Sequence, residues 1–183
     1  MSRNAQLLAE LVSYQAADEL DARHHAAFLE LLSGPADAFE RTRFEPGHIT
    51  ASLFIIDEGA HALLLHHHRR LNRWLQMGGH VEEGESTVAA ALREGREESG
   101  LGDLQLITGA ILDLDVHPIP AGMGEPDHFH FDVRYLACTL DRSGIAMDDK
   151  ESNQLAWIPL NEAEALMNEG ASSRVIRKIR SRA

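Results

Sequence analysis

Apolar residues recur at helical spacing along the first part of the chain. They share one face of each of two predicted helices, over residues 5–16 and 18–32. Pro35, in the sequence SGP, cannot continue the hydrogen-bond ladder of the second helix and marks its end. A short third helical piece is expected to carry Phe39, and a Pro-Gly turn at 46–47 closes this region.

After that turn the pattern changes to short apolar or alternating runs, which favour strands. The predicted strands cover residues 49–56, 62–66, 73–77, 104–108, 112–117 and 128–140. A helical segment rich in glutamate interrupts them, and the run at 155–160 precedes a short helix and a basic helical tail. The pattern predicts an α/β fold with a mixed sheet flanked by helices, in a domain at 48–183 that follows an N-terminal helical extension at 1–47.

Composition narrows the functional classes. The formal net charge of −12 argues against a nucleic-acid-binding surface, which is normally basic. Cys138 is the only cysteine, so neither a disulfide nor a cysteine zinc site can form within one chain. The N-terminus carries acids and lacks the apolar core of a signal peptide, and no apolar run approaches the roughly 20 residues of a membrane span. We therefore expect a soluble, cytoplasmic protein with neither membrane nor nucleic-acid partners.

Glutamates crowd the segment GHVEEGESTVAAALREGREESGL. Ser86 or Thr87 can cap the N-terminus of a helix here, and Gly100 can follow its last turn. Three carboxylates at positions i, i+3 and i+4 share one face of this helix. They belong to Glu94, Glu97 and Glu98.

Two interpretations of this helix stay open. Like charges on one face repel one another by a few tenths of a kcal/mol per pair, which a solvated surface helix tolerates. The same crowding becomes useful if the oxygens bind Mg²⁺ or Mn²⁺, because these cations prefer oxygen ligands and bridge to substrate phosphates. A backbone carbonyl of the Gly78–Gly79 pair could add a ligand, and Arg93 could clamp the carboxylate of Glu85.

The spacing favours the second interpretation. Gly79, five residues, Glu85, seven residues and then the run REGREESGL at 93–101 follow the pattern G-x5-E-x7-R-E-U-x-E-E-x-G-U, in which U is aliphatic. This segment resembles the Nudix box, and the order of elements over about 48–170 is similar to the same family. Gly95 stands at the first aliphatic position, and Met77 and His80 flank the two glycines, where the family often has a proline.

The resemblance implies a Nudix-type α/β/α sandwich and a MutT-like pyrophosphohydrolase that splits a nucleoside diphosphate linked to another group, with Mg²⁺ or Mn²⁺ as cofactor. By position, the metal ligands would be Glu94, Glu97, Glu98 and the Gly79 carbonyl, one glutamate would act as general base, and Arg93 would pair with Glu85. Glu151, shortly before the late Trp157, is a further ligand candidate.

Two other functions remain as alternatives. The chain could be a Nudix-fold protein that senses a nucleotide without cleaving it, although a sensor has no need of every carboxylate. It could also resemble the prenyl diphosphate isomerases of the same fold. Those have a divergent box and a catalytic cysteine, whereas Cys138 lies in a strand well after the box. The N-terminal helices could cover a pocket or build a homodimer.

A second polar patch is expected on the strands at 112–117 and 128–135, which alternate in polarity and could pair as antiparallel neighbours. We expect it beside the carboxylate helix, either as a solvated sheet face or as a substrate pocket or a further metal position. Its candidate residues are His130, Asp132 and Arg134, and Trp74 is a further candidate that could stack on a base or belong to the core. The basic run at 66–73 is expected in a solvated loop, and the cations of the C-terminal tail at the end of a helix.

Overall fold

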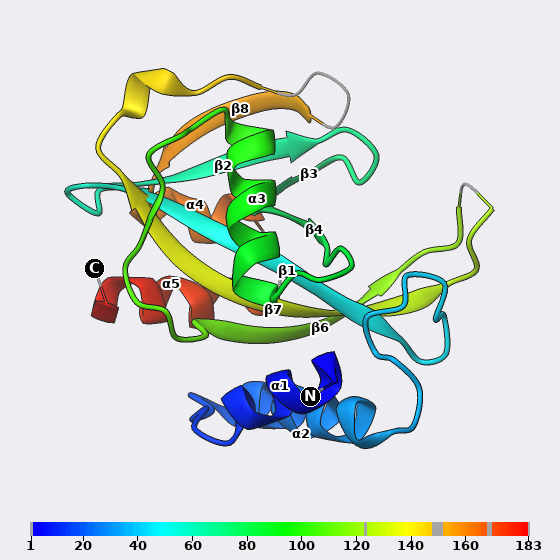
Figure 1. Ribbon diagram of the computed structural model, residues 1–183. Coiled ribbons are helices and arrows are strands. Elements are labelled where there is room, and N and C mark those ends of the chain that lie inside the picture. The colour runs from blue at the N-terminus through cyan, green and yellow to red at the C-terminus, as the bar shows by residue number, and fades with distance from the viewer. Residues whose placement is uncertain (1, 123, 148–151, 168–169, 183) are drawn as a thin grey trace.

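The computed structural model of the chain describes residues 2–122, 124–147, 152–167 and 170–182. Within these residues, eight strands form one mixed sheet with helices on both faces (Figure 1). The strands are β1 Gly47–Asp57, β2 Ala62–His68, β3 Arg73–Leu75, β4 Met77–His80, β5 Gln105–Leu106, β6 Asp113–Ile119, β7 His128–Thr139 and β8 Ser152–Pro159. The helices are α1 Arg3–Leu11, α2 Glu19–Ser33, α3 Thr87–Ser99, α4 Leu160–Met167 and α5 Ser172–Arg182, with a 3-10 turn η1 at Arg142–Gly144.

Two long strands organise the sheet. β1 and β7 run parallel over their whole length, with His48 opposite His130. On its other side β1 pairs antiparallel with β4 and with β2, and β2 in turn pairs with β3 and β8. β7 pairs antiparallel with β6 and β5 on its outer side. The mixed sheet that the sequence predicts is therefore confirmed.

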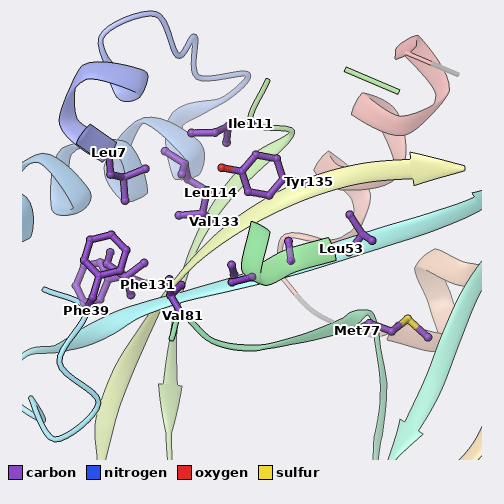
Figure 2. Close-up of a cluster of buried hydrophobic side chains, with 14 of the residues drawn as sticks. Leu7, Phe39, Leu53, Met77, Val81, Ile111, Leu114, Phe131, Val133 and Tyr135 are labelled. Atoms are coloured by element: carbon purple, nitrogen blue, oxygen red, sulfur yellow. The ribbon is translucent and has the colours of Figure 1, made fainter. Parts of the chain in front are cut away.

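Each face of the sheet carries its own hydrophobic core. One core joins β1, β6 and β7 to α3 and to the two N-terminal helices, and Figure 2 shows Leu53, Met77, Val133 and Tyr135 within it. The other core joins Phe54 and Leu136 to α4 and α5, which cover the opposite face. This arrangement is the expected α/β/α sandwich, because alternate residues of the central strands are buried on both sides.

The N-terminal helices pack on the same face as α3. α1 ends at Leu11, earlier than expected, and α2 begins after Asp18, whose carboxylate accepts a hydrogen bond from the Asp21 N–H at 2.9 Å. The expected helical piece around Phe39 is wrong, because this residue lies in a turn. Its ring is nevertheless buried in the core, so the segment is held by packing and not by helical hydrogen bonds.

The C-terminal tail corrects another expectation. Arg174 in α5 is buried, and its guanidinium donates to both oxygens of Asp113 on β6 at 2.8 and 3.1 Å. Lys178 donates to Asp113 at 2.7 Å and to Asp21 of α2 at 2.6 Å. The tail cations that face the sheet thus form a buried ionic network, which fastens α2 to β6 and α5.

The basic run at 66–73 also differs from the prediction. His66, His67 and His68 belong to β2, and buried His66 contacts the Ser152 hydroxyl through Nδ1 at 2.7 Å. Residues 66–68 are therefore a strand that pairs with both β3 and β8, whereas residues 69–72 form the turn that the sequence predicts here. Among the described residues, no helix has the length and apolar character that a membrane crossing requires.

Candidate functional site

The site is built around α3, and its local sequence sets both ends of that helix. The Ser86 hydroxyl accepts from the Ala89 N–H, and Gly100 adopts the left-handed conformation at φ 75° that ends the last turn. Gly95 lets the helix approach β1 closely, because a Cβ added there would lie 2.5 Å from the Leu53 side chain. The glycine at an aliphatic position of the box thus has a packing reason.

Arg93 gathers the carboxylates of the box. Its guanidinium binds Glu85 through two hydrogen bonds of 2.9 and 3.1 Å, so the pair expected from the sequence is present. Nη1 also donates to Glu94 at 2.9 Å and to Glu97 at 3.1 Å, and Nη2 donates to the His80 carbonyl at 2.9 Å. These contacts lower the pKa of the Glu85 carboxyl and raise that of Arg93.

Strand β4 lies against the other carboxylates. Glu98 is buried, and its carboxylate accepts a hydrogen bond from the Gly78 N–H at 2.8 Å. A Cβ added to Gly79 would lie 2.4 Å from Oε1 of Glu94, which shows how closely this glycine approaches that side chain. The side chains of Glu94 and Glu97 are 16% and 59% exposed, so solvent reaches the site from the Glu97 side.

The electrostatic balance of the site is negative. The guanidinium of Arg93 pairs with three carboxylates, of Glu85, Glu94 and Glu97, and a fourth, of Glu98, lies against Gly78. Nη1 of Arg93 holds the Glu94 and Glu97 carboxylates together on one side, while Glu98 lies against β4. Their residue types fit a hard divalent cation, and an excess of negative charge remains for it to neutralise. Glu151 lies outside the described residues.

The predicted pairing of β6 with β7 is confirmed, but the polar patch is not beside α3. His117 lies opposite His130, and Asp115 opposite Asp132. The Tyr135 hydroxyl contacts Thr87 of α3 at 2.7 Å, so the alternate residues His130, Asp132 and Arg134 point to the opposite face of the sheet. The expected location was wrong, because the alternation of a strand does not say which of its faces receives which helix.

The residues of this patch differ in their surroundings. Arg134 is almost completely buried and donates to Asp132 and to Asp115, each at 2.9 Å. Burial opposes the charge on Asp115, but the Arg134 guanidinium outweighs it and holds the pKa of that carboxyl far below its usual range. Asp132 also accepts from the hydroxyls of Thr50 and Ser52 at 3.2 and 2.7 Å. Both charged candidates therefore satisfy one another inside the protein.

His130 and Trp74 are partly exposed. The Trp74 ring lies on β3, edge to face with His67 at 5.4 Å, and packs against the core below α4 and α5. His130 belongs to a group that we call the histidine cluster, which consists of His48, His80, His117, His128 and His130. Sequence analysis found His130 through its alternating strand but missed His48 and His80, since only the pairing of β1 with β7 and β4 brings them together.

The comparisons with known proteins agree with this geometry. The family model of the NUDIX domain matches residues 46–179. The chain is 29% identical over 123 residues to a CMP-5'-(N-acetyl-N-hydroxy-3-aminopropyl)phosphonate hydrolase of Streptomyces rubellomurinus, covering 66% of this chain and 55% of the relative. It is 32% identical over 104 residues to the m7GpppN-mRNA hydrolase NUDT17 of Xenopus laevis, covering 52% of this chain and 34% of the relative.

Solved structures support the fold. An Ap4A hydrolase of C. elegans, in a binary complex, superposes with a TM-score of 0.59 at 20% identity, over 73% of this chain and 95% of the other. A NUDIX family hydrolase from Clostridium perfringens superposes with a TM-score of 0.55 at 27% identity, over 73% of this chain and 97% of the other. The chain spans about half and about a third of the length of the two curated relatives. Since the family model covers most of its length and the box lies at the expected place on α3, the chain belongs to the Nudix family.

Proposed function

We propose that this protein hydrolyses a phosphoanhydride bond in a small nucleoside diphosphate that carries a further group, with Mg²⁺ or Mn²⁺ as cofactor. The observation that carries the proposal is the arrangement of box carboxylates around Arg93 and against β4. A hydrolase of this kind must neutralise charge on phosphate oxygens and activate water. Such a set of oxygens is suited to that chemistry.

The metal would be held by Glu94, Glu97, Glu98 and the carbonyl of Gly79. When bound, a divalent cation supplies Lewis acidity and lowers the pKa of a bound water. The fit rests on the donor set, because every candidate ligand is an oxygen and the carboxylates outnumber the single guanidinium.

The chain's own residues divide the remaining work. Arg93 positions Glu94 and Glu97 through Nη1 and holds the loop before α3 through Glu85 and the His80 carbonyl. The Gly78 N–H fixes the Glu98 carboxylate in a buried place. One of the three α3 glutamates accepts the proton of the attacking water. The guanidinium stays protonated throughout, since its pKa is raised by the bonds to Glu85.

The substrate class follows from weaker signals. Both curated relatives carry names that specify a nucleotide compound, a CMP phosphonate in one and an m7GpppN-mRNA in the other. The net charge of −12 disfavours a long polyanion, so we propose a small nucleotide as the substrate. Among the four candidate pocket residues, Trp74 and His130 are partly exposed, but their side chains lie on the sheet face opposite α3, so the proposal gives neither a contact with the bond that is cleaved. Asp132 and Arg134 are buried against one another, so in this proposal they position the strand behind His130.

The test is a panel of nucleoside diphosphate and triphosphate derivatives, incubated with Mg²⁺, then Mn²⁺, then a chelator. We expect cleavage of one class that needs the cation and stops with the chelator. Cleavage that survives the chelator contradicts the proposal. Tight binding of one derivative without cleavage would instead support the nucleotide sensor, in which the carboxylates only clamp a cation-bound ligand.

A further inference from the structure

The histidine cluster lies on the face of the sheet opposite α3. His48 of β1 sits opposite His130 of β7, with ring centroids 4.9 Å apart, and His128 approaches both rings at 5.1 and 5.2 Å. His48 and His128 are buried, and His130 is half-buried. Ligand nitrogens of these three rings all lie within 4.8 Å of one another, and among the described residues no other group of histidine, cysteine or acidic side chains converges this way.

Hydrogen bonds to two of these rings determine which ring nitrogen carries the proton. Nδ1 of His48 contacts the Arg43 carbonyl at 3.1 Å, and Nδ1 of His128 contacts the Pro126 carbonyl at 2.9 Å. A carbonyl oxygen only accepts, so each Nδ1 carries the proton and each Nε2 keeps its lone pair. Histidines that bind metals show this arrangement, because donation from one nitrogen fixes the tautomer and raises the basicity of the other.

From this geometry we infer that His48, His128 and His130 form a second metal site, distinct from the box carboxylates, which takes a cation that prefers imidazole, with Zn²⁺ as the representative. Imidazole nitrogen suits Zn²⁺, Ni²⁺, Co²⁺ and Cu²⁺, whereas Mg²⁺ prefers oxygen. Bonds of about 2.0–2.1 Å in a tetrahedral site place ligand nitrogens about 3.4 Å apart. The present spread, within 4.8 Å, must shorten to that distance when the cation binds.

His80 lies beside two of these rings and is the candidate for a fourth ligand. Its Nε2 lies 3.1 Å from Nε2 of His48, and since His48 uses its lone pair there, His80 donates this hydrogen bond in the absence of a cation. A bound cation replaces this bond: the His80 proton moves to Nδ1 as the ring changes tautomer, and Nε2 of each ring then presents a lone pair to the cation. His117 stays in the second layer, with its Nδ1 held by Asp115 at 3.0 Å.

His80 also joins this site to the carboxylate site. Its side chain belongs to the histidine cluster, while its backbone carbonyl accepts from Arg93 at 2.9 Å. Two residues earlier on β4, the Gly78 N–H holds Glu98. A cation at the histidines therefore restrains the strand that positions the box, and we expect it to stabilise the fold without being a substrate-binding ion.

The test uses wild-type protein stripped with a chelator and returned to excess Mg²⁺, which keeps the carboxylates occupied. Calorimetric titration with Zn²⁺ should show one tight equivalent, and the melting temperature should rise by about 5 to 10 °C at a 100-fold excess over Kd. X-ray absorption of the bound zinc should show imidazole nitrogen at about 2.0–2.1 Å. This measurement needs no variant, so it decides the ligand type even where a substitution harms folding.

Variants locate the site. His130→Asn and His128→Asn should each weaken Zn²⁺ binding at least about tenfold, while His67→Asn on β2 and Glu98→Gln in the box should leave it unchanged. No tight zinc equivalent in excess Mg²⁺ overturns the inference. So does bound zinc that has only oxygen ligands, or binding that is lost in His67→Asn and retained in His130→Asn. None of these readouts depends on hydrolysis, so failure here leaves the proposed activity untouched.

Discussion

Gly79→Ala is the most revealing small change at the carboxylate site. The added methyl carbon would lie 2.4 Å from Oε1 and 2.7 Å from Cδ of Glu94. Ordinary contact requires the Glu94 carboxylate to retreat by about 1 Å. The atoms that must move are the far end of a flexible and partly exposed side chain, so the fold can absorb the change.

The two consequences differ in size. The free energy of unfolding should fall by about 1 kcal/mol or less, at the low end of what overpacking costs, because backbone atoms do not clash. Hydrolysis should fall by about 100-fold, since a 1 Å misplacement in an active site has an effect of that order. Gly102→Ala is the matched control, because a Cβ there would meet nothing within 4 Å.

The assay compares kcat/KM and urea unfolding for wild type, Gly79→Ala and Gly102→Ala. A Gly79→Ala protein that retains wild-type kcat/KM would show that the position of the Glu94 carboxylate does not matter, and the site assignment would be wrong. A loss of several kcal/mol in unfolding free energy would show that Glu94 cannot move, and would refute the reasoning about magnitude.

Three further predictions test other parts of the structure. Arg93→Lys should lower kcat/KM by about 10- to 100-fold with the fold retained, because an ammonium cannot replace the bidentate clamp on Glu85; unchanged kinetics would contradict this. Arg174→Met should cost about 3 kcal/mol in urea unfolding, since it leaves buried Asp113 without its main partner, whereas exposed Arg177→Met should cost less than about 1 kcal/mol; equal losses would refute the buried network. Burial lowers the pKa of His66 from 6.5 to about 4, so the unfolded chain takes up a proton at this residue before the folded protein does. The free energy of unfolding should therefore have its full value above about pH 6.5 and fall by roughly 1.4 kcal/mol per pH unit as the pH drops towards 4, a slope that His66→Asn should reduce.

Local signals in the sequence predicted what depends on neighbours along the chain. The cap at Ser86, the left-handed Gly100 and the shared face of the glutamates all follow from spacing within one helix. The antiparallel pairing of β6 with β7 also followed, because both strands alternate and a short connection joins them. The Nudix fold itself came from the spacing of the box.

Contacts between segments far apart in the sequence determine the positions that the sequence did not predict. From the sequence, Arg174 is expected to be a surface cation of a basic tail, because its partner Asp113 lies 61 residues away and cannot be inferred from its neighbours. His48 sits beside His130 only through the parallel register of β1 and β7, which alternation within either strand does not reveal. The same register turns the polar face of β7 away from α3. Charged and histidine side chains were therefore the hardest to place, since their environment depends on segments far apart in the chain.

The central claim is that the glutamates of α3 carry the chemistry, and Glu98→Gln tests it most directly. The amide oxygen of glutamine can still accept the Gly78 N–H, so the melting temperature should stay close to that of wild type. Initial rates should be measured against Mg²⁺ concentration on the derivative that wild type cleaves, with exposed Glu162→Gln on α4 as the charge-matched control. We predict a loss of at least about 100-fold at saturating Mg²⁺ for Glu98→Gln alone. A folded Glu98→Gln protein with the rate of wild type would contradict the account.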